Sequence, residues 1–415
     1  LHAGVARAAL TPVEGDQVLD HARAHFPDLV PDGVIDLAEL PFLDLARARP
    51  WYGRQPAQAR VFYSTGTSGF PKPIGWTAAE DEWYVAEKRE LLHDWLTGCE
   101  RGFVSVAVGH NADSVRILLT GLGMAVYDAG LSALDLQIER VVGLDPHVLY
   151  CSPTILWRLV AQLRQVGAEL PSVRRVITNG EVLSEAARSA IQQQFGLPPD
   201  AVMDTYGSTE VGTNAATCTD CGLLHFLDGI YPEAVPPGAL DGQPDLASGP
   251  GDDRCVLAVS SIKRTSFPVI RLVTYDVVQG LRRVTCGGRE RWSIERVVGR
   301  CDEVLNYGEL FSAHDLDDLL APAGVARWLA FNPDNALIVV VEGPRPEDFT
   351  RDFARRFPLH QQLIDLGLIP PPVIHFLAVD YDRFLARAGM PTTVSGKAGP
   401  RVHHTFDAAW MEGLC

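Results

Sequence analysis

Apolar residues recur with two different periods between residues 78 and 195, and these periods predict alternating helices and strands. Almost continuously apolar runs predict strands at 103–108, 124–127, 147–151 and 173–178. Helical spacing appears at 78–96, 113–123, 134–142, 154–166 and 184–195, and Thr77 is placed to cap the first of these helices. Apolar strands separated by helices are typical of a parallel sheet, so this pattern predicts an α/β architecture.

The pattern changes after residue 217. Short β-rich runs with many Gly and Pro residues predict an antiparallel, β-rich subdomain at 217–299. Helices at 314–320 and 346–357 and strands at 328–331, 336–341 and 373–378 then predict a compact α+β unit. We expect two domains, residues 1–300 and 301–415, with the boundary at Arg300–Asp302.

Composition and charge narrow the class of protein. Hydrophobic residues make up 47% and charged residues 21% of the 415 residues, which is typical of soluble globular chains. The formal charge of −16 argues against nucleic acid or an anionic membrane as a partner. No apolar run reaches the roughly 18 residues that cross a bilayer, and no basic region precedes an apolar one at the N-terminus. These features predict a cytoplasmic protein.

The segment from Tyr63 to Lys72 has the composition of an anion-binding loop. It follows the apolar run 61–63 and contains Ser64, Thr65, Gly66, Thr67, Ser68 and Gly69. Glycines allow backbone N–H groups to turn toward one anion, hydroxyl groups add donors, and Lys72 adds a positive charge. The spacing does not match the GxxxxGK[ST] pattern. A surface turn between two strands is the alternative.

Two more polar segments follow predicted strands. One is Asn179-Gly180-Glu181, and the other is a loop from Asp204 to Glu210 after a short strand at 201–203. Ligands bind at the carboxyl ends of strands in open parallel sheets, so all three segments are expected to meet in one crevice. Glu210 supplies oxygen ligands suited to Mg²⁺. The alternative for Glu210 is a capping residue in a turn at the end of the strand.

Three of the eight cysteines form a candidate metal site. Cys218 and Cys221 have the CxxC spacing that binds one tetrahedral ion, and His225 and Cys286 would complete a Cys₃His set. The expected ion is a structural Zn²⁺. Buried thiols beside a hydrogen-bonded histidine are the alternative.

Seven segments in this order resemble the adenylate-forming superfamily of acyl-CoA synthetases and peptide-synthetase adenylation domains, and within it the phenylacetate–CoA ligase-like group. They span nearly the whole chain: 63–72, 152–158, 179–184, 206–210, 267–276, 299–302 and 391–397. Comparable cysteine positions form a zinc site in several members of that group.

The resemblance implies a role for each matching residue. The loop 64–72 would cover the triphosphate of ATP, and Asn179, Gly180, Glu181 and Tyr206 would frame the adenine, with Tyr206 stacking on it. Asp204 would be a further cofactor-binding residue. Asp276 would hold the ribose, assisted by Arg300. Thr209 would touch the α-phosphate, Glu210 would bind Mg²⁺, and Lys397 would reach the carboxylate. Asp302 would be the hinge of a mobile C-terminal domain. The acid pocket would include His110, Gly121, Met124, Ser152, Pro153 and Gly207, with a polar-network role as the alternative for His110.

The implied reaction is the activation of a carboxylic acid, expected to be a small aryl acid, to an acyl-adenylate with release of pyrophosphate. Transfer to a thiol would follow, with coenzyme A as the first candidate acceptor. A carrier protein, an amine, or another oxyanion as substrate are alternatives, and a nucleotide-binding regulator without turnover is an alternative of another class. The oligomeric state stays open, a homodimer included.

Overall fold

The computed structural model describes residues 10–54, 56, 59–63, 72–106, 109–130, 134–181, 183, 185–236, 239 and 253–300, and further segments of 304–410. The chain divides into two compact units. The first consists of Leu1–Glu181 and Gln192–Val297, and the second of Val182–Ile191 and Val298–Cys415.

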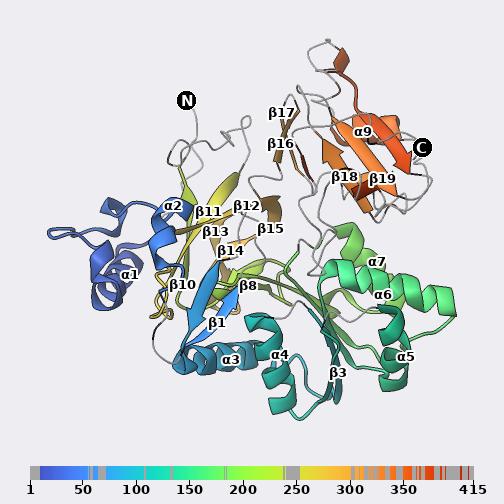
Figure 1. Cartoon of the computed structure of the whole chain (residues 1–415), viewed down its shortest axis with the longest axis horizontal. Coiled ribbons are helices and arrows are strands. Elements are labelled where there is room, and N and C mark those ends of the chain that lie inside the picture. The colour runs from blue at the N-terminus through green and yellow to red at the C-terminus, as the bar shows by residue number, and fades with distance from the viewer. Residues whose placement is uncertain are drawn as a thin grey trace. The chain divides into compact units, whose positions relative to one another are not determined.

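The first unit is built on a nine-stranded mixed sheet with the order β13-β14-β9-β8-β7-β6-β5-β3-β4 (Figure 1). Its parallel part contains β3 (Arg101–Ser105), β4 (Ala125–Asp128), β5 (Val148–Cys151), β6 (Arg175–Asn179) and β7 (Val202–Ser208). Its antiparallel part contains β8 (Gly212–Thr217), β9 (Leu224–Phe226), β13 (Arg282–Cys286) and β14 (Arg289–Ile294). The predicted α/β class with a parallel sheet is confirmed.

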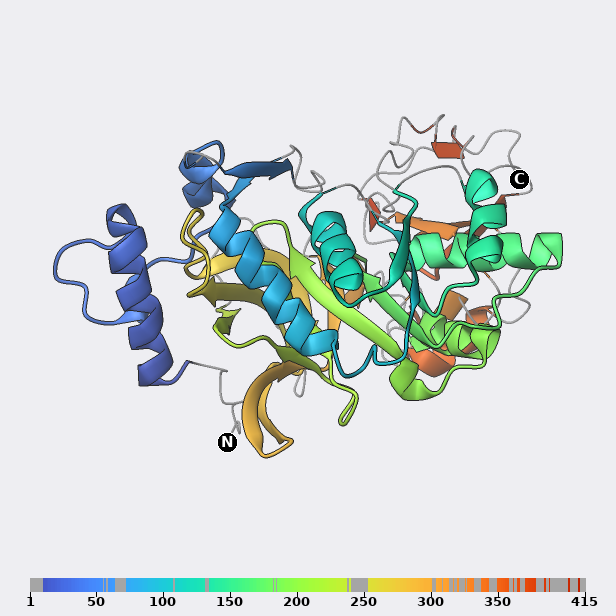
Figure 2. The same ribbon diagram turned by 90° about the horizontal axis from the view of Figure 1, so that it is seen from below.

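Helices alternate with the parallel strands as the sequence predicts. They are α3 (Ala78–Leu92), α4 (His110–Gly121), α5 (Leu134–Leu144), α6 (Pro153–Val166) and α7 (Glu185–Phe195). The predicted cap is present, because the Thr77 side chain accepts from the backbone N–H of Glu80 while the Glu80 carboxylate accepts from that of Thr77. Helices α3 and α4 lie side by side (Figures 1 and 2). None of the described helices is long and apolar enough to cross a membrane.

The β-rich stretch 217–299 is divided between two sheets, which differs from the single subdomain that we expected. Strands β9, β13 and β14 extend the central sheet, because antiparallel pairing continues from β7 through β8. A separate four-stranded sheet has the order β10-β11-β12-β15, formed by Ile230–Val235, Arg254–Ser261, Leu272–Gln279 and Arg296–Arg300. The runs of apolar residues in the sequence carry no information about which sheet each strand joins.

The N-terminal segment adds a helix and a hairpin. Helix α1 (Pro12–His25) begins at a capping box, in which Thr11 and Glu14 accept hydrogen bonds from each other's backbone N–H groups. Strands β1 (Arg60–Tyr63) and β2 (Pro73–Trp76) pair as antiparallel neighbours. The segment between them lies outside the described residues, and with it Ser64–Gly69. The remaining short helices are α2 (Leu45–Ala48) and 3₁₀ turns at Pro27–Leu29, Leu37–Glu39, Arg49–Trp51 and Pro199–Ala201.

The second unit is an α+β structure with its own core. Its sheet has the order β20-β19-β18-β21, formed by Val373–Leu377, Ile338–Glu342, Arg327–Phe331 and Val402–His403, and β16 (Val304–Tyr307) pairs with β17 (Glu309–Ser312). Helix α9 (Phe349–Arg356) packs Phe349 and Phe353 against Trp328 and Val341. Alternation along the strands places Leu329 and Val340 in a second cluster with Phe384 and Leu377.

Candidate active site

Lys72 and Glu210 are 138 residues apart in the sequence and form an ion pair in the structure. The Lys72 Nζ lies 3.0 Å from Glu210 Oε1, and both side chains are largely buried. Lys72 directly precedes β2, and Glu210 lies in the turn between β7 and β8. The same ammonium lies 5.5 Å from the ring centroid of Tyr52, which stacks on Phe267. The structure therefore brings together two of the three polar segments that the sequence predicts to meet.

The turn that carries Glu210 is held by two buried donors. Trp76 Nε1 donates to the carbonyl oxygen of Thr209 at 3.0 Å, and Arg264 Nε donates to that of Glu210 at 2.9 Å. This segment differs from our prediction of a loop over 204–210, because β7 continues to Ser208 and only a tight turn remains before β8. Gly207 is required in this hairpin, since a Cβ there would collide with the carbonyl oxygen of Gly212.

Arg264 and Glu80 form a fully buried ion pair beside this turn. Their closest atoms, Arg264 Nη1 and Glu80 Oε2, are 2.7 Å apart, and the guanidinium lies 3.7 Å from the ring centroid of Trp76. Glu80 also accepts hydrogen bonds from the backbone N–H groups of Thr265 and Ser266. Burial alone would raise the pKa of Glu80, but Arg264 and these donors lower it below its usual range. The carboxylate is therefore charged at neutral pH.

Tyr206 and Asp276 are also joined. The Tyr206 hydroxyl donates to Asp276 Oδ2 at 2.7 Å, which links β7 of the central sheet to β12 of the second sheet. Tyr275, beside Asp276, has a left-handed backbone with φ of 61°, and its hydroxyl accepts from the backbone N–H of Leu45. A non-glycine residue in this conformation is uncommon and is enriched at functional sites.

The third predicted segment begins at the end of β6. Asn179 is the last residue of that strand and is paired with Thr205 of β7, and Gly180 follows with φ of 80°. Asp204 accepts from the Thr178 hydroxyl at 2.7 Å, so its carboxylate is directed toward β6. Glu181 closes this segment within the first unit. The nucleotide-binding roles expected for these residues therefore remain predictions.

The predicted acid-pocket residues separate into two groups. His110, Ser152, Pro153 and Gly207 lie at or beyond the carboxyl ends of β3, β5 and β7 or in β7 itself. Gly121 and Met124 lie at the opposite end of α4 from His110, and Met124 is packed in the core. Twelve helical residues span about 18 Å, so Gly121 and Met124 lie far along the axis of α4 from His110.

His110 and Ser152 also have structural partners. The His110 ring stacks on Trp76 at 3.6 Å and pairs through Nε2 with Asp81 at 2.8 Å. Burial lowers the pKa of His110 to about 4, although Asp81 acts in the opposite direction, so the imidazole is neutral at neutral pH. Ser152 caps α6 by accepting from the backbone N–H of Ile155. The polar-network alternative for His110 is thus the arrangement that the structure displays.

The four predicted metal ligands lie together. The ligand atoms of Cys218, Cys221, His225 and Cys286 all lie within 4.8 Å of one another. The sulfurs of Cys218 and Cys286 are 3.7 Å apart, and Cys221 Sγ lies 2.9 Å from His225 Nε2. Burial would raise the pKa of the Cys218 thiol, but backbone hydrogen bonds from Cys221 and Asp220 lower it, which favours the thiolate that binds metal.

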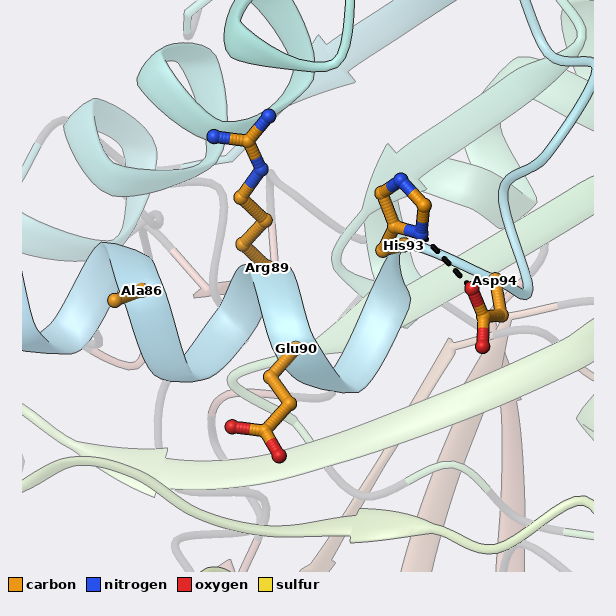
Figure 3. A pocket seen from close by; sticks show the side chains of 5 residues that line it. All are labelled: Ala86, Arg89, Glu90, His93 and Asp94. Carbon is orange, nitrogen blue, oxygen red and sulfur yellow. Dashed lines mark hydrogen bonds and ion pairs between the residues drawn. The ribbon is translucent and has the colours of Figure 1, made fainter.

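A surface hollow of about 420 Å³ lies along the outer side of α3 and the turn after it (Figure 3). It is lined by Ala86, Arg89, Glu90, His93 and Asp94, which are solvent-exposed. Figure 3 shows His93 and Asp94 joined by a hydrogen bond and Arg89 and Glu90 pointing in different directions. None of the predicted site residues lines this hollow.

The other residues that the sequence predicts for the site lie in the second unit or outside the described residues. Arg300 is the last residue of β15 and belongs to the second unit. The segment 64–69, the hinge residue Asp302 and Lys397 lie outside the described residues. Sequence reasoning missed Tyr52, Trp76, Glu80 and Arg264, and only Glu80 had a local signal, the Thr77–Glu80 capping box.

The family model described as AMP-binding enzyme matches residues 17–237, and the chain belongs to this family. A fumarate–(S)-2,3-diaminopropanoate ligase of Enterobacter agglomerans is 26% identical over 64% of this chain and 66% of its own length. A phenylacetate-coenzyme A ligase of Aromatoleum evansii is 26% identical over 70% of this chain and 66% of its own. The chain thus spans about two thirds of the length of these relatives.

A solved 2-hydroxyisobutyryl-CoA ligase in its postadenylation state, in complex with R3-HIB-AMP, has the same fold. Its TM-score is 0.69 at 15% identity, with 95% of this chain and 88% of that chain covered. The predicted resemblance to adenylate-forming enzymes, including the phenylacetate–CoA ligase-like group, is confirmed.

Proposed function

We propose that this protein uses ATP to activate a carboxylic acid as an acyl-adenylate, with release of pyrophosphate, and then transfers the acyl group to an acceptor. The observation that carries the proposal is the pairing of Lys72 with Glu210 beside the linked Tyr206 and Asp276, in a chain of the AMP-binding enzyme family. A cation, a carboxylate, an aromatic ring and a second carboxylate are the groups needed to hold a nucleotide triphosphate and its metal ion.

The nucleotide would lie across the ends of β6, β7 and β12. Lys72, with the segment 64–69, would neutralise the triphosphate, and Asp276 would accept hydrogen bonds from the ribose hydroxyls. Tyr206 would stack on the adenine, with Asn179, Gly180, Glu181 and Asp204 around the base. Arg300 would assist at the ribose.

The chemical step joins two anions, so its catalysis is mainly positioning and charge neutralisation. An oxygen of the substrate carboxylate attacks the α-phosphorus of ATP, and the bond from that phosphorus to the pyrophosphate oxygen breaks. Thr209 would bind the α-phosphate. Lys397 would bring a positive charge to the carboxylate and the α-phosphate when a mobile domain at 301–415 closes about Asp302.

The Glu210 carboxylate has the chemistry of a magnesium ligand. It is largely buried and its present partner is the Lys72 ammonium, so its negative charge is already directed toward a cation. Hard cations such as Mg²⁺ prefer oxygen ligands and share them with substrate phosphates. Mg²⁺ held by Glu210 would supply charge neutralisation on the phosphate oxygens.

Coenzyme A is the acceptor that we propose first, since phenylacetate-coenzyme A ligase is the name of two of the relatives. The relative named as a ligase of fumarate and (S)-2,3-diaminopropanoate supports an amine acceptor as the alternative. A carrier-protein thiol is a third acceptor class. For the acid, a small aryl acid agrees with phenylacetate in these names, and a short dicarboxylic acid agrees with fumarate.

A structural Zn²⁺ bound by Cys218, Cys221, His225 and Cys286 is part of this proposal. Zn–S bonds of about 2.3 Å in a tetrahedron place two sulfurs about 3.8 Å apart. The 3.7 Å between Cys218 and Cys286 agrees with that separation. The ion would join the turn after β8 to the hairpin of β13 and β14, and with four protein ligands it would have no open position for catalysis.

The test is pyrophosphate release from Mg-ATP with a panel of aryl, short aliphatic and dicarboxylic acids, with and without coenzyme A. Release that depends on one acid supports activation, and faster turnover with coenzyme A supports a thioester product. If coenzyme A has no effect, diaminopropanoate and other amines are tested as acceptors. ATP binding without release on any acid would favour the nucleotide-binding regulator instead.

A further inference from the structure

Lys88 is a buried lysine in α3, and its partners Asn111, Ser114 and Tyr84 are neutral. It is 3% exposed, and its Nζ donates to Asn111 Oδ1 at 2.8 Å and to the Ser114 hydroxyl at 3.0 Å. The ring centroid of Tyr84 lies 4.5 Å from the same atom. Among the described residues, no carboxylate lies within ion-pair distance of Lys88. Burial lowers the pKa of Lys88 to about 7.

A buried ammonium without a counter-anion is uncommon, because its desolvation costs several kcal/mol unless an opposite charge offsets it. The chain has only four lysines. Of these, Lys72 is paired with Glu210. Lys88 is the lysine placed in a neutral, buried environment, so its position is not explained by an ion pair within the described structure.

The environment of Lys88 lies at the carboxyl ends of parallel strands. Asn111 is in the first turn of α4, which follows β3, and Tyr150 is the second-to-last residue of β5. The Tyr150 hydroxyl donates to the same Asn111 Oδ1 at 3.0 Å. Strands β3 and β5 are parallel neighbours, and ligands of open α/β sheets bind beyond this edge. Asn111 directly follows His110, and Tyr150 lies two residues before Ser152, both of which the sequence predicts for the acid pocket.

We propose that Lys88 and Asn111 form the part of the acid-binding site that receives a second carboxylate, so that the substrate is a short dicarboxylic acid. This inference rests on the proposed activation of a carboxylic acid and names its substrate class. The second carboxylate supplies the counter-anion that Lys88 lacks, and accepts the charge-assisted hydrogen bonds of the ammonium. Bound there, the second carboxylate keeps Lys88 protonated, whereas an acid with a methyl group in that position gains no such interaction and is the poorer substrate.

The experiment compares matched acids that differ in one carboxylate: succinate with butyrate, and malonate with propionate. The readout is the ratio of kcat/KM values for pyrophosphate release from Mg-ATP. We expect the wild type to prefer the dicarboxylate by roughly 100-fold or more, since a site built for a polar group discriminates strongly against its absence. Lys88→Met should lower this ratio toward one, through a loss of kcat/KM on the dicarboxylate.

Two further variants make the result specific. Lys263→Met is the matched control, because Lys263 is a half-buried lysine of the same unit that lies over the ring of Trp83 and has no role in the proposed site, and its ratio should equal that of the wild type. Asn111→Asp places a carboxylate beside Lys88 and supplies an internal counter-anion. It should lose the preference for dicarboxylates with no loss of thermal stability, so the conclusion does not depend on whether Lys88→Met folds.

A wild type that uses monocarboxylic acids equally well or better would overturn the role of Lys88 and leave acid activation intact. A folded Lys88→Met or Asn111→Asp variant with the wild-type ratio would do the same, and would make Lys88 a structural lysine. Absence of acid-dependent release with both series would count against acid activation itself, and this inference would fall with it.

Discussion

Removal of the buried charge at Arg264 is predicted to destabilise the first unit more than any surface change. Arg264→Met keeps most of the side-chain volume but leaves the Glu80 carboxylate buried without its cation, and Glu80 is 3% exposed. Breaking a buried ion pair by removing one partner costs about 3–5 kcal/mol. The substitution also removes the donors to the carbonyl oxygens of Glu210 and Gly75.

The assay is urea unfolding followed by tryptophan fluorescence, with hydrogen exchange of β2 and α3 as a local readout. Trp76 lies directly under the Arg264 guanidinium, so its emission reports on this pair. The matched control is Arg282→Met, which breaks an exposed pair with Glu295 of the same 2.7 Å length. Exposed pairs contribute about 0–1 kcal/mol, so the control should change stability little.

The double variant Glu80→Gln/Arg264→Met isolates the interaction. Because each single variant leaves an uncompensated charge and the double variant leaves none, its loss of stability should be smaller than the sum of the two single losses. The coupling should lie in the range of about 0.5–3 kcal/mol or above. Additive losses, or an Arg264→Met variant within 1 kcal/mol of the wild type, would refute the reasoning. The lowered pKa of Glu80 adds a pH dependence: its contribution is present above the ordinary carboxyl range and is lost as pH falls through the lower folded value.

Three other predictions concern the nucleotide, the buried lysine and the metal. Tyr206→Phe removes the hydrogen bond to Asp276, and such a bond to a charged acceptor contributes about 1.5–3 kcal/mol. The variant should raise the KM for ATP about tenfold and change kcat less. An unchanged KM would contradict the proposed role of this pair. Between about pH 7 and 10.5 the unfolded chain holds a proton on Lys88 that the folded protein has lost. The free energy of unfolding of the wild type should therefore rise with pH relative to that of Lys88→Met, and parallel curves of unfolding free energy against pH would be evidence against the lowered pKa. Cys221→Ser should lower bound zinc and the Tm before it lowers activity, whereas Cys99→Ser should do neither; metal analysis of the wild type without zinc would remove that site.

The sequence was sufficient to predict the elements that depend on local pattern. The helix after Thr77 is an example, because its cap, its acidic first turn and its apolar spacing all lie within a few residues. Periodicity also predicted the order of helices and strands through α7. The usual position of ligands at the carboxyl ends of parallel strands predicted that Lys72 and Glu210 lie close together.

Other contacts between distant segments were not predictable from the sequence. Glu80 and Arg264 are 184 residues apart, and nothing near either residue indicates the other. The extension of β7 to Ser208 depends on pairing with β8, which a polar segment rich in Gly and Thr does not suggest. Gly121 and Met124 were assigned to the acid pocket through resemblance, whereas the length of α4 places them at its other end.

The most direct test of acid activation is exchange of labelled pyrophosphate into ATP, measured with Mg²⁺ and a carboxylic acid but with no acceptor. A reversible acyl-adenylate requires exchange that depends on the acid, and Lys72→Met should reduce it strongly while the folded state is retained. Exchange that occurs without any added acid would contradict the account. So would a protein that still binds ATP but shows no exchange with any of the acids tested.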